Sequence, residues 1–311
     1  MLRREITSRS LPSIEGWTIV EGSWRTEAQR PWRPIWNNDS NSLDIKANGD
    51  TCDGQTYLLT FADVAQFEII YPSREIRVLP FDEHVPVHTI GHLLVDQVWP
   101  RILAHDGALV LHASGVASSE GAILFVGPSG RGKSTLSASL HQRGLPLIGD
   151  DAVVIEEHGG DARCQAVYRS LRLYSDSIET LFDPSIEQSD VADYTDKRNI
   201  HLPSLDAADV RHAVRAIFFI NPENSAGSAR VSPVSPGAAC MRLVEHNFWL
   251  DPTDMARTAC KLTRASALAA CVPAWQLDYR RDFSSLDDVH AAIFARLANP
   301  IDHKDHHSVA T

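Results

Sequence analysis

The chain has 311 residues, of which 43% are hydrophobic and 22% are charged, proportions that are typical of an ordinary globular protein. Its formal net charge of −11 argues against non-specific binding to nucleic acid, and no apolar run approaches the roughly 20 residues that span a membrane. Basic residues at the N-terminus precede no apolar segment, so no secretory signal is predicted and a cytoplasmic location is expected.

The cysteines predict no disulfide framework and no zinc site. They are odd in number, widely spaced and contain no C-x-x-C pair: Cys52, Cys164, Cys240, Cys260 and Cys271. This pattern favours reduced, mostly buried thiols.

Residues 1–84 predict an N-terminal mainly-β module. Short apolar or alternating runs occur at 56–61, 67–71 and 74–80, and the turn-forming segments NNDSNS, ANGD and CDGQ precede them. No catalytic cluster stands out in this part of the chain.

Residues 85–299 predict an α/β domain. A helix is expected over 88–107, with Ile90, Leu94 and Val98 among its apolar positions and a kink at Pro100. Strands are expected at 108–114, 121–127, 145–157, 213–220, 229–234 and 274–279, and helices from the 127–135 loop to Gly144 and at 237–247, 253–270 and 285–297. The polar tail 300–311 predicts disorder.

The segment GPSGRGKST, Gly127 to Thr135, satisfies the phosphate-binding pattern G-x-x-x-x-G-K-[ST]. In this pattern backbone N–H groups and a lysine, here Lys133, surround the phosphates, and a serine hydroxyl, here Ser134, ligates Mg²⁺. The segment also follows a predicted strand and opens a predicted helix, as the pattern requires. We therefore predict ATP and Mg²⁺ as cofactors, with contacts from Gly127, Ser129, Gly130, Arg131, Gly132, Lys133, Ser134 and Thr135. The alternative is a glycine-rich turn with an exposed lysine.

Asp150 and Asp151 end the strand that follows the predicted helix, which returns both carboxylates to the loop at the carboxyl edge of a parallel sheet. Because successive strand residues point to opposite sides, one aspartate would face Mg²⁺ and its neighbour a substrate hydroxyl. This arrangement suits phosphoryl transfer. The alternative is a solvated turn or a single metal ligand.

His112 lies 15 residues before Gly127, at the end of a predicted strand. A lone histidine in such a place is more often structural than functional. Arg172, Lys197 and Arg198 are candidate cations for a transferring phosphate, with a surface position as the alternative. His303, His306 and His307 resemble a metal-binding tract only in composition, and a solvated tail is the favoured interpretation.

The run LHASGVASSEGAILFVGPSGRGKSTLSASLHQRGLPLIGDD resembles the core of the HPr kinase/phosphorylase family, over about residues 105 to 185. The resemblance implies a P-loop core of the HPr kinase and phosphoenolpyruvate carboxykinase type and ATP-dependent phosphorylation of a protein serine. It implies that His112 contacts the transferred phosphate. It also implies that Asp150 accepts the serine proton and that Asp151 helps to hold Mg²⁺.

The chain departs from that family at three places. SLRLYSDSIETLF keeps Arg172 but has Ser170 where the family has a metal-binding glutamate, Ala238 replaces an arginine in SPGAACMRLVE, and Thr135 replaces an acidic residue. These departures put the reverse, phosphate-removing reaction in doubt, and with it HPr as the substrate.

LLVDQVWPRILA before LVLHAS, and RSLRLYSDS after the core, look more like the HPr-kinase-like serine kinases of peptide-modification gene clusters. That branch includes kinases of the C-terminal serine of lasso-peptide precursors, so the resemblance implies a peptide or small protein as the partner. The family also suggests a ring-like homo-oligomer. Two other functions remain open: a kinase of an HPr-type carrier or of a small metabolite such as a free amino acid, and a nucleotide-binding regulator without phosphoryl transfer.

Overall fold

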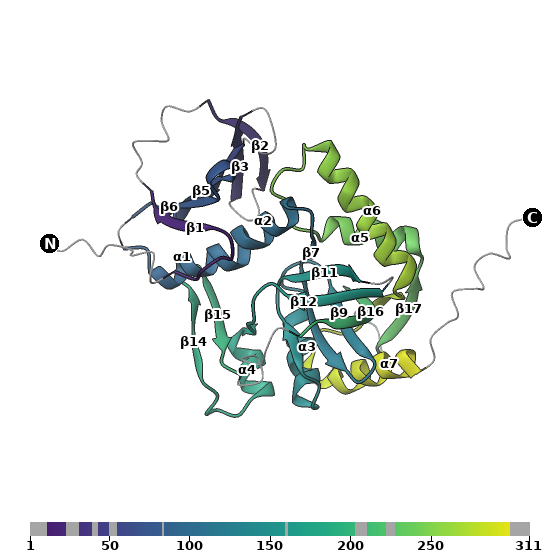
Figure 1. Cartoon of the computed structure of the whole chain (residues 1–311). Helices are drawn as coiled ribbons and strands as arrows, with labels where there is room; N and C mark the ends of the chain where they lie inside the picture. Colours follow the sequence, from purple (N-terminus) through teal and green to yellow (C-terminus); the bar gives the residue numbers. More distant parts are fainter. Residues whose placement is uncertain are drawn as a thin grey trace, which may run out of the picture.

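The computed structural model describes residues 11–22, 31–38, 43–49, 55–82, 84–158, 161–202, 210–221 and 228–298 (Figure 1). Within these ranges the chain forms three sheets and several helices, which confirms the mixed α/β class. No helix in these ranges is long and apolar enough to cross a membrane. Cys52 and the tail, with His303, His306 and His307, lie outside the described residues.

The first sheet has six strands in the order β1-β6-β5-β4-β3-β2, antiparallel except for the pair β1 and β6. The three predicted strands are confirmed, although Tyr71 lies in a short 3-10 turn and not at the end of its strand. The strands are β1 (Thr18–Glu21), β2 (Arg33–Asn38), β3 (Leu43–Asn48), β4 (Thr56–Phe61), β5 (Ala65–Ile70) and β6 (Glu75–Pro80).

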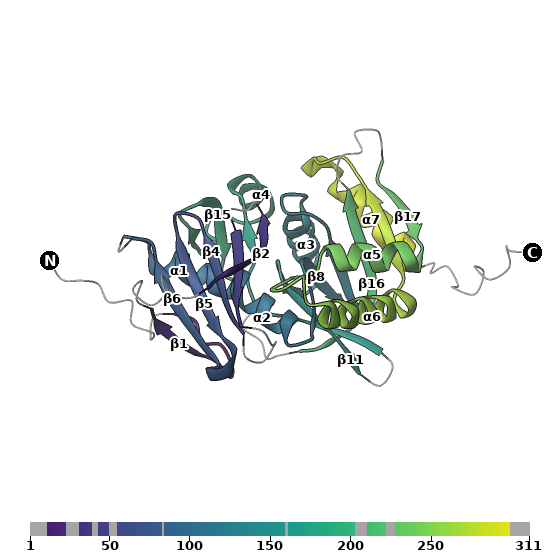
Figure 2. The ribbon, with the colours of Figure 1, turned by 90° about the horizontal axis from the view of Figure 1, so that it is seen from above.

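The predicted helix before the second sheet is present but contains a wider turn. It consists of α1 (Val87–Leu93), the π-helical segment η5 (Leu94–Val98) and α2 (Trp99–His105). The wide turn precedes Pro100, whose ring and missing N–H do not fit a regular helix interior. Ile90, Leu94 and Val98 are fully buried in one cluster with side chains of the first sheet. In Figure 2, α2 lies between the first sheet and the second sheet.

The second sheet has nine strands, in the order β10-β8-β9-β16-β12-β11-β7, with β18 beside β16 and β17 beside β18. The expected parallel sheet is wrong in one respect: only β9, β16 and β18 pair in parallel, and the other pairs are antiparallel. The strands are β7 (Leu109–Leu111), β8 (Ala113–Ser118), β9 (Gly121–Val126), β10 (Leu147–Gly149), β11 (Val153–His158), β12 (Asp161–Ala166), β16 (His212–Asn221), β17 (Arg230–Val234) and β18 (Ala274–Asp278).

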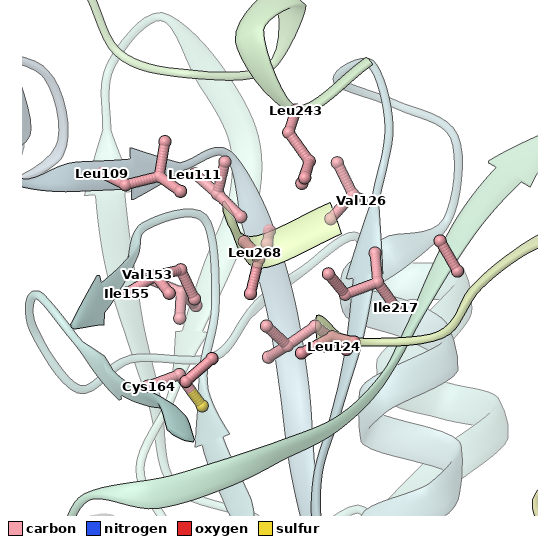
Figure 3. Packing of buried hydrophobic residues seen from close by; sticks show 14 of the residues in the cluster. Leu109, Leu111, Leu124, Val126, Val153, Ile155, Cys164, Ile217, Leu243 and Leu268 are labelled. Carbon is pink, nitrogen blue, oxygen red and sulfur yellow. The ribbon is translucent and has the colours of Figure 1, made fainter. Parts of the chain in front are cut away.

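Helices cover both faces of this sheet. The helices are α3 (Lys133–Gln142), α5 (Pro236–Glu245), α6 (Met255–Cys271) and α7 (Leu286–Ala298), all close to their predicted ranges. Leu124 and Val126 of β9 pack with residues of α5 and α6 on one face (Figure 3), while Ile123 and Phe125 pack with residues of α3 and α7 on the other. This alternation fixes β9 and the residues that follow it.

A third, small sheet was not predicted. It has the order β13-β15-β14, and α4 lies between β13 and β14 in the sequence. The elements are β13 (Arg172–Leu173), α4 (Ser175–Leu181), β14 (Gln188–Ala192) and β15 (Thr195–Ile200). The turn between β14 and β15 contacts α1, where the Asp193 N–H donates to Thr89 Oγ1 at 3.2 Å. The two strands are polar and short, so their sequence carries little periodic signal.

A buried lysine on α6 should make stability depend on pH. Lys261 is 3% exposed and donates from Nζ to the Phe248 carbonyl at 3.0 Å. Burial, with Arg257 and Arg101 nearby, lowers the pKa of Lys261 to about 7. The unfolded chain therefore binds the proton more tightly, and stability rises as the pH increases from about 7 towards the ordinary lysine pKa of about 10.4.

We expect the stability of wild type relative to Lys261→Met to grow by about 1.4 kcal/mol per pH unit over that window. Urea unfolding of both proteins from pH 6 to pH 10 measures this difference, and the subtraction removes the contribution of other groups. A difference that stays constant with pH would show that Lys261 keeps an ordinary pKa.

Candidate active site

The loop between β9 and α3 has a backbone that requires glycine at two positions. Gly130 and Gly132 have φ angles of +75° and +92°, in the left-handed region that glycine adopts without strain. A Cβ on Gly132 would also lie 3.2 Å from Tyr279 Oη, and one on Gly127 would lie 3.3 Å from the Ile220 carbonyl. The glycines of the sequence pattern are therefore explained by backbone conformation and close approach.

The side chain of Lys133 is buried against the carbonyls of this loop. Its Nζ donates to the carbonyls of Gly127 and Pro128 at 2.8 and 3.0 Å, and the residue is 4% exposed. Burial lowers the pKa of Lys133 to about 8, although Asp151 and Asp150 act in the opposite direction. No side chain caps the N-terminus of α3, so the first N–H groups of the helix remain available to an anion.

Asp150 lies beside the loop serine. It follows β10, which runs in the same direction as β9 because both are antiparallel to β8. Ser134 Oγ donates to Asp150 Oδ1 at 2.8 Å, and the Arg172 N–H donates to Oδ2 at 3.3 Å. Burial and the neighbouring Asp151 raise the pKa of Asp150 to about 6.

The environment of Asp151 differs from that of Asp150, and its backbone conformation shows that the single strand predicted here is wrong. The strand expected over 145–157 is two strands, β10 and β11, and Asp151 lies between them with φ +68°. The two aspartates therefore do not alternate along one extended strand. Asp151 Oδ2 lies 2.6 Å from an Nη of Arg172. Burial is the largest influence and raises the pKa of this carboxyl, but Arg172, His112 and Lys197 together more than offset it, so the pKa falls and Asp151 is ionised.

His112 holds the backbone of that turn. The strand predicted over 108–114 is also two strands, and His112 separates β7 from β8. Its Nδ1 lies 3.0 Å from the Asp151 carbonyl and its Nε2 lies 3.9 Å from Asp151 Oδ1. Burial and Lys133 lower its pKa to about 4, so the ring is neutral. A neutral ring beside a carbonyl donates from Nδ1 and leaves Nε2 as an acceptor.

Arg172 joins the aspartates to the helix before the second sheet. One Nη bonds Asp96 Oδ1 at 2.5 Å as well as Asp151, and the other lies 2.9 Å from His92 Nδ1. Tyr168 Oη contacts both Asp96 and Arg172. Asp96, His92 and Tyr168 were not predicted from the sequence, although a charged residue within the apolar run LLVDQVW is a signal that could have identified Asp96.

A cavity opens between the loop and these charged groups. Its lining contains one carboxylate, Asp151, and four basic side chains, Lys133, Arg172, Lys197 and Arg281. Asp150 and His112 lie outside this lining. Of the predicted pair, Lys197 lines the cavity, whereas Arg198 forms an ion pair with Asp190 and does not line it. The remaining lining residues are Ser129, Gly130, Gly132, Ser134, Thr135, Leu173 and Tyr174.

Within the described residues, no group of three or more His, Cys, Asp or Glu side chains could hold a metal ion by itself. Ser134 and Asp150 still present a hydroxyl and a carboxylate oxygen 2.8 Å apart. Mg²⁺ prefers oxygen ligands and commonly takes one or two from the protein and the rest from phosphate and water. The donor set therefore fits Mg²⁺ bound together with a nucleotide.

No protein-family model and no curated protein matches this chain. One similar solved structure is the Hpr(Ser) kinase/phosphatase from Coxiella burnetii, with 12% sequence identity and a TM-score of 0.33. The match covers 61% of this chain and 97% of that chain. A TM-score of this size does not establish a common fold.

Proposed function

We propose that the protein is a phosphotransferase that uses ATP and Mg²⁺ to phosphorylate a serine hydroxyl on a peptide or small protein. The observation that carries the proposal is that Lys133 and the ionised Asp151 line one cavity. A phosphate-binding loop without a carboxylate nearby would bind a nucleotide but would have no group to accept a proton. A carboxylate without the loop would have no phosphate donor beside it.

The loop and the N-terminus of α3 form the nucleotide side of the site. The left-handed glycines give the loop the tight turns that allow backbone N–H groups to converge on phosphate oxygens, and Lys133 adds a positive charge from its place beside two loop carbonyls. Ser134 and Asp150 would hold Mg²⁺, which supplies positive charge that polarises the phosphates when it is bound.

Asp151 and the basic residues form the acceptor side. We assign proton acceptance to Asp151, because it lines the cavity and Asp150 does not. The roles that the family resemblance implied for the two aspartates are therefore exchanged. Arg172 supplies the charge that stabilises the transferring phosphate, and His112 fixes the turn that presents Asp151.

Two basic side chains suit an acceptor that carries a carboxylate of its own. Lys197 and Arg281 line the cavity, and neither makes an ion pair with another described residue. In a C-terminal serine, three bonds separate the hydroxyl oxygen from the carbon of the carboxylate. Both groups would therefore enter the same cavity. This supports a C-terminal serine as the acceptor, and the resemblance in the sequence extends the proposal to that of a lasso-peptide precursor.

Mass spectrometry of peptides incubated with the protein, ATP and Mg²⁺ tests the function. Three sets of candidate acceptors are incubated separately: serine-ended peptides, an HPr-type carrier, and free amino acids including serine. Phosphate on the peptide serine supports the proposal, phosphate only on a carrier or a metabolite favours those kinases, and nucleotide binding without any phosphorylated product favours a regulator.

The acceptor carboxylate gives a sharper prediction. A serine-ended peptide with a free C-terminus should be phosphorylated with a kcat/KM at least about tenfold above that of its C-terminal amide, the size expected for losing a charged hydrogen bond. Lys197→Met and Arg281→Met should each reduce this preference. The control is Lys46→Met on β3, which leaves the preference unchanged, and equal rates for acid and amide in wild type would refute carboxylate recognition.

A further inference from the structure

A buried ion pair connects the cavity to the helix before the second sheet. Arg172 and Asp96 are 4% and 8% exposed, and a single Nη of Arg172 lies 2.5 Å from Asp96 Oδ1 and 2.6 Å from Asp151 Oδ2. The guanidinium therefore lies between the carboxylate that faces the cavity and one that comes from η5.

The helix that carries Asp96 has two distinct faces. Its apolar side chains Ile90, Leu94 and Val98 are buried with the first sheet. His92 and Asp96, four residues apart, instead contact Arg172. Asp96 lies within the π-helical segment, a rare element that often occurs at functional sites.

Stability alone does not account for these contacts. Desolvating two charges offsets much of the attraction between them, so a buried ion pair is weak evidence of a stabilising role. A guanidinium fixed by a second carboxylate, however, has one orientation, and a fixed orientation is what a charge-stabilising group beside a reacting phosphate requires. Tyr168, which contacts both partners, restricts the pair further.

We propose that Asp96, assisted by His92, is a positioning residue that holds Arg172 in its orientation beside Asp151 and the cavity. The first sheet then supports the site mechanically, because it buries the apolar face of the helix whose other face holds Arg172. The effect on catalysis rests on the proposed phosphoryl transfer; the effect on Arg172 does not.

A double-mutant cycle measures the catalytic effect. Asp96→Asn and Arg172→Lys should each lower kcat for peptide phosphorylation about 10- to 100-fold, as the loss of a supporting contact commonly does, with KM for ATP unchanged. The double variant should be no slower than Arg172→Lys alone. Asp106→Asn is the matched control, because Asp106 pairs with Arg74 at 2.9 Å near the end of α2 and away from the cavity, and it should retain wild-type kcat.

Rates are normalised to the fraction of protein that binds nucleotide, so partial unfolding does not count as a loss of kcat. A wild-type kcat for Asp96→Asn, or a double variant whose loss is the product of the two single losses, would overturn the proposal. If Asp96→Asn does not fold, His92→Phe takes its place in the same cycle, with the same two outcomes.

A readout without catalysis separates this inference from the proposed function. In NMR spectra the Nη–H signals of Arg172, assigned by their loss in Arg172→Lys, should exchange with solvent more slowly in wild type than in Asp96→Asn, because a neutral amide oxygen accepts a weaker hydrogen bond than a carboxylate. If wild type phosphorylates no acceptor, the proposed function fails and this comparison still decides the role of Asp96. Equal protection in both proteins would overturn it.

Discussion

Replacing Asp151 with asparagine lowers kcat for serine phosphorylation by about 10²- to 10⁴-fold, the range that a general base contributes. Asparagine keeps the size of the side chain and an oxygen that can accept from Arg172, 2.6 Å away in wild type. It cannot accept the proton of the serine hydroxyl. Nucleotide affinity should remain near the wild-type value, since Lys133 and the loop are unchanged, and single-turnover kinetics with labelled ATP measures both quantities.

Asp150→Asn is the informative comparison, because it places the same substitution one residue away. Asp150 accepts from Ser134 Oγ at 2.8 Å and does not line the cavity. We expect this variant to need more Mg²⁺ for half-maximal nucleotide binding, measured by titration without an acceptor. Normal transfer by Asp151→Asn, together with loss of transfer and unchanged Mg²⁺ dependence in Asp150→Asn, would restore the roles that the family resemblance implied.

The sequence predicted the parts of the site that depend on local chemistry. Glycine positions, apolar runs and short connections predicted the loop from Gly127 to Thr135 and the helix after it. They also predicted that Asp150 returns to the edge of the sheet beside that loop. These features are set by residues close together in the chain, so their patterns can be read without a tertiary structure.

The parts that were missed depend on contacts between distant segments. Asp96 lies 76 residues before Arg172, and no motif links them. The left-handed φ of Asp151 is another example, because the run LPLIGDDAVVIEE looks like one continuous strand. Tertiary packing determines both the break in that strand and the carboxylate that faces the cavity, and strand alternation alone gave the wrong geometry.

Replacing Lys133 with methionine should abolish activity by weakening nucleotide binding and transfer together. The buried Nζ donates to two loop carbonyls, and Lys133 also lines the cavity. Methionine has a similar length but neither charge nor donor. Loss of a hydrogen bond to a charged group costs about 1.5–3 kcal/mol, which corresponds to a loss of about 10- to 100-fold in ATP affinity. Removing a group that stabilises transition-state charge lowers kcat by a further factor of about 10² to 10³.

Lys133→Arg distinguishes the need for a compact ammonium from the need for any positive charge. The two carbonyls accept from one Nζ atom at 2.8 and 3.0 Å, a geometry that the larger planar guanidinium does not reproduce. We therefore expect Lys133→Arg to fail nearly as completely as Lys133→Met, while Lys46→Met on the first sheet remains fully active. Calorimetric titration with ATP and Mg²⁺, beside a thermal unfolding curve for each variant, measures the effect on folded protein. Wild-type ATP affinity in Lys133→Met would mean that the loop does not hold the phosphates, and the proposed kinase would lose its phosphate donor.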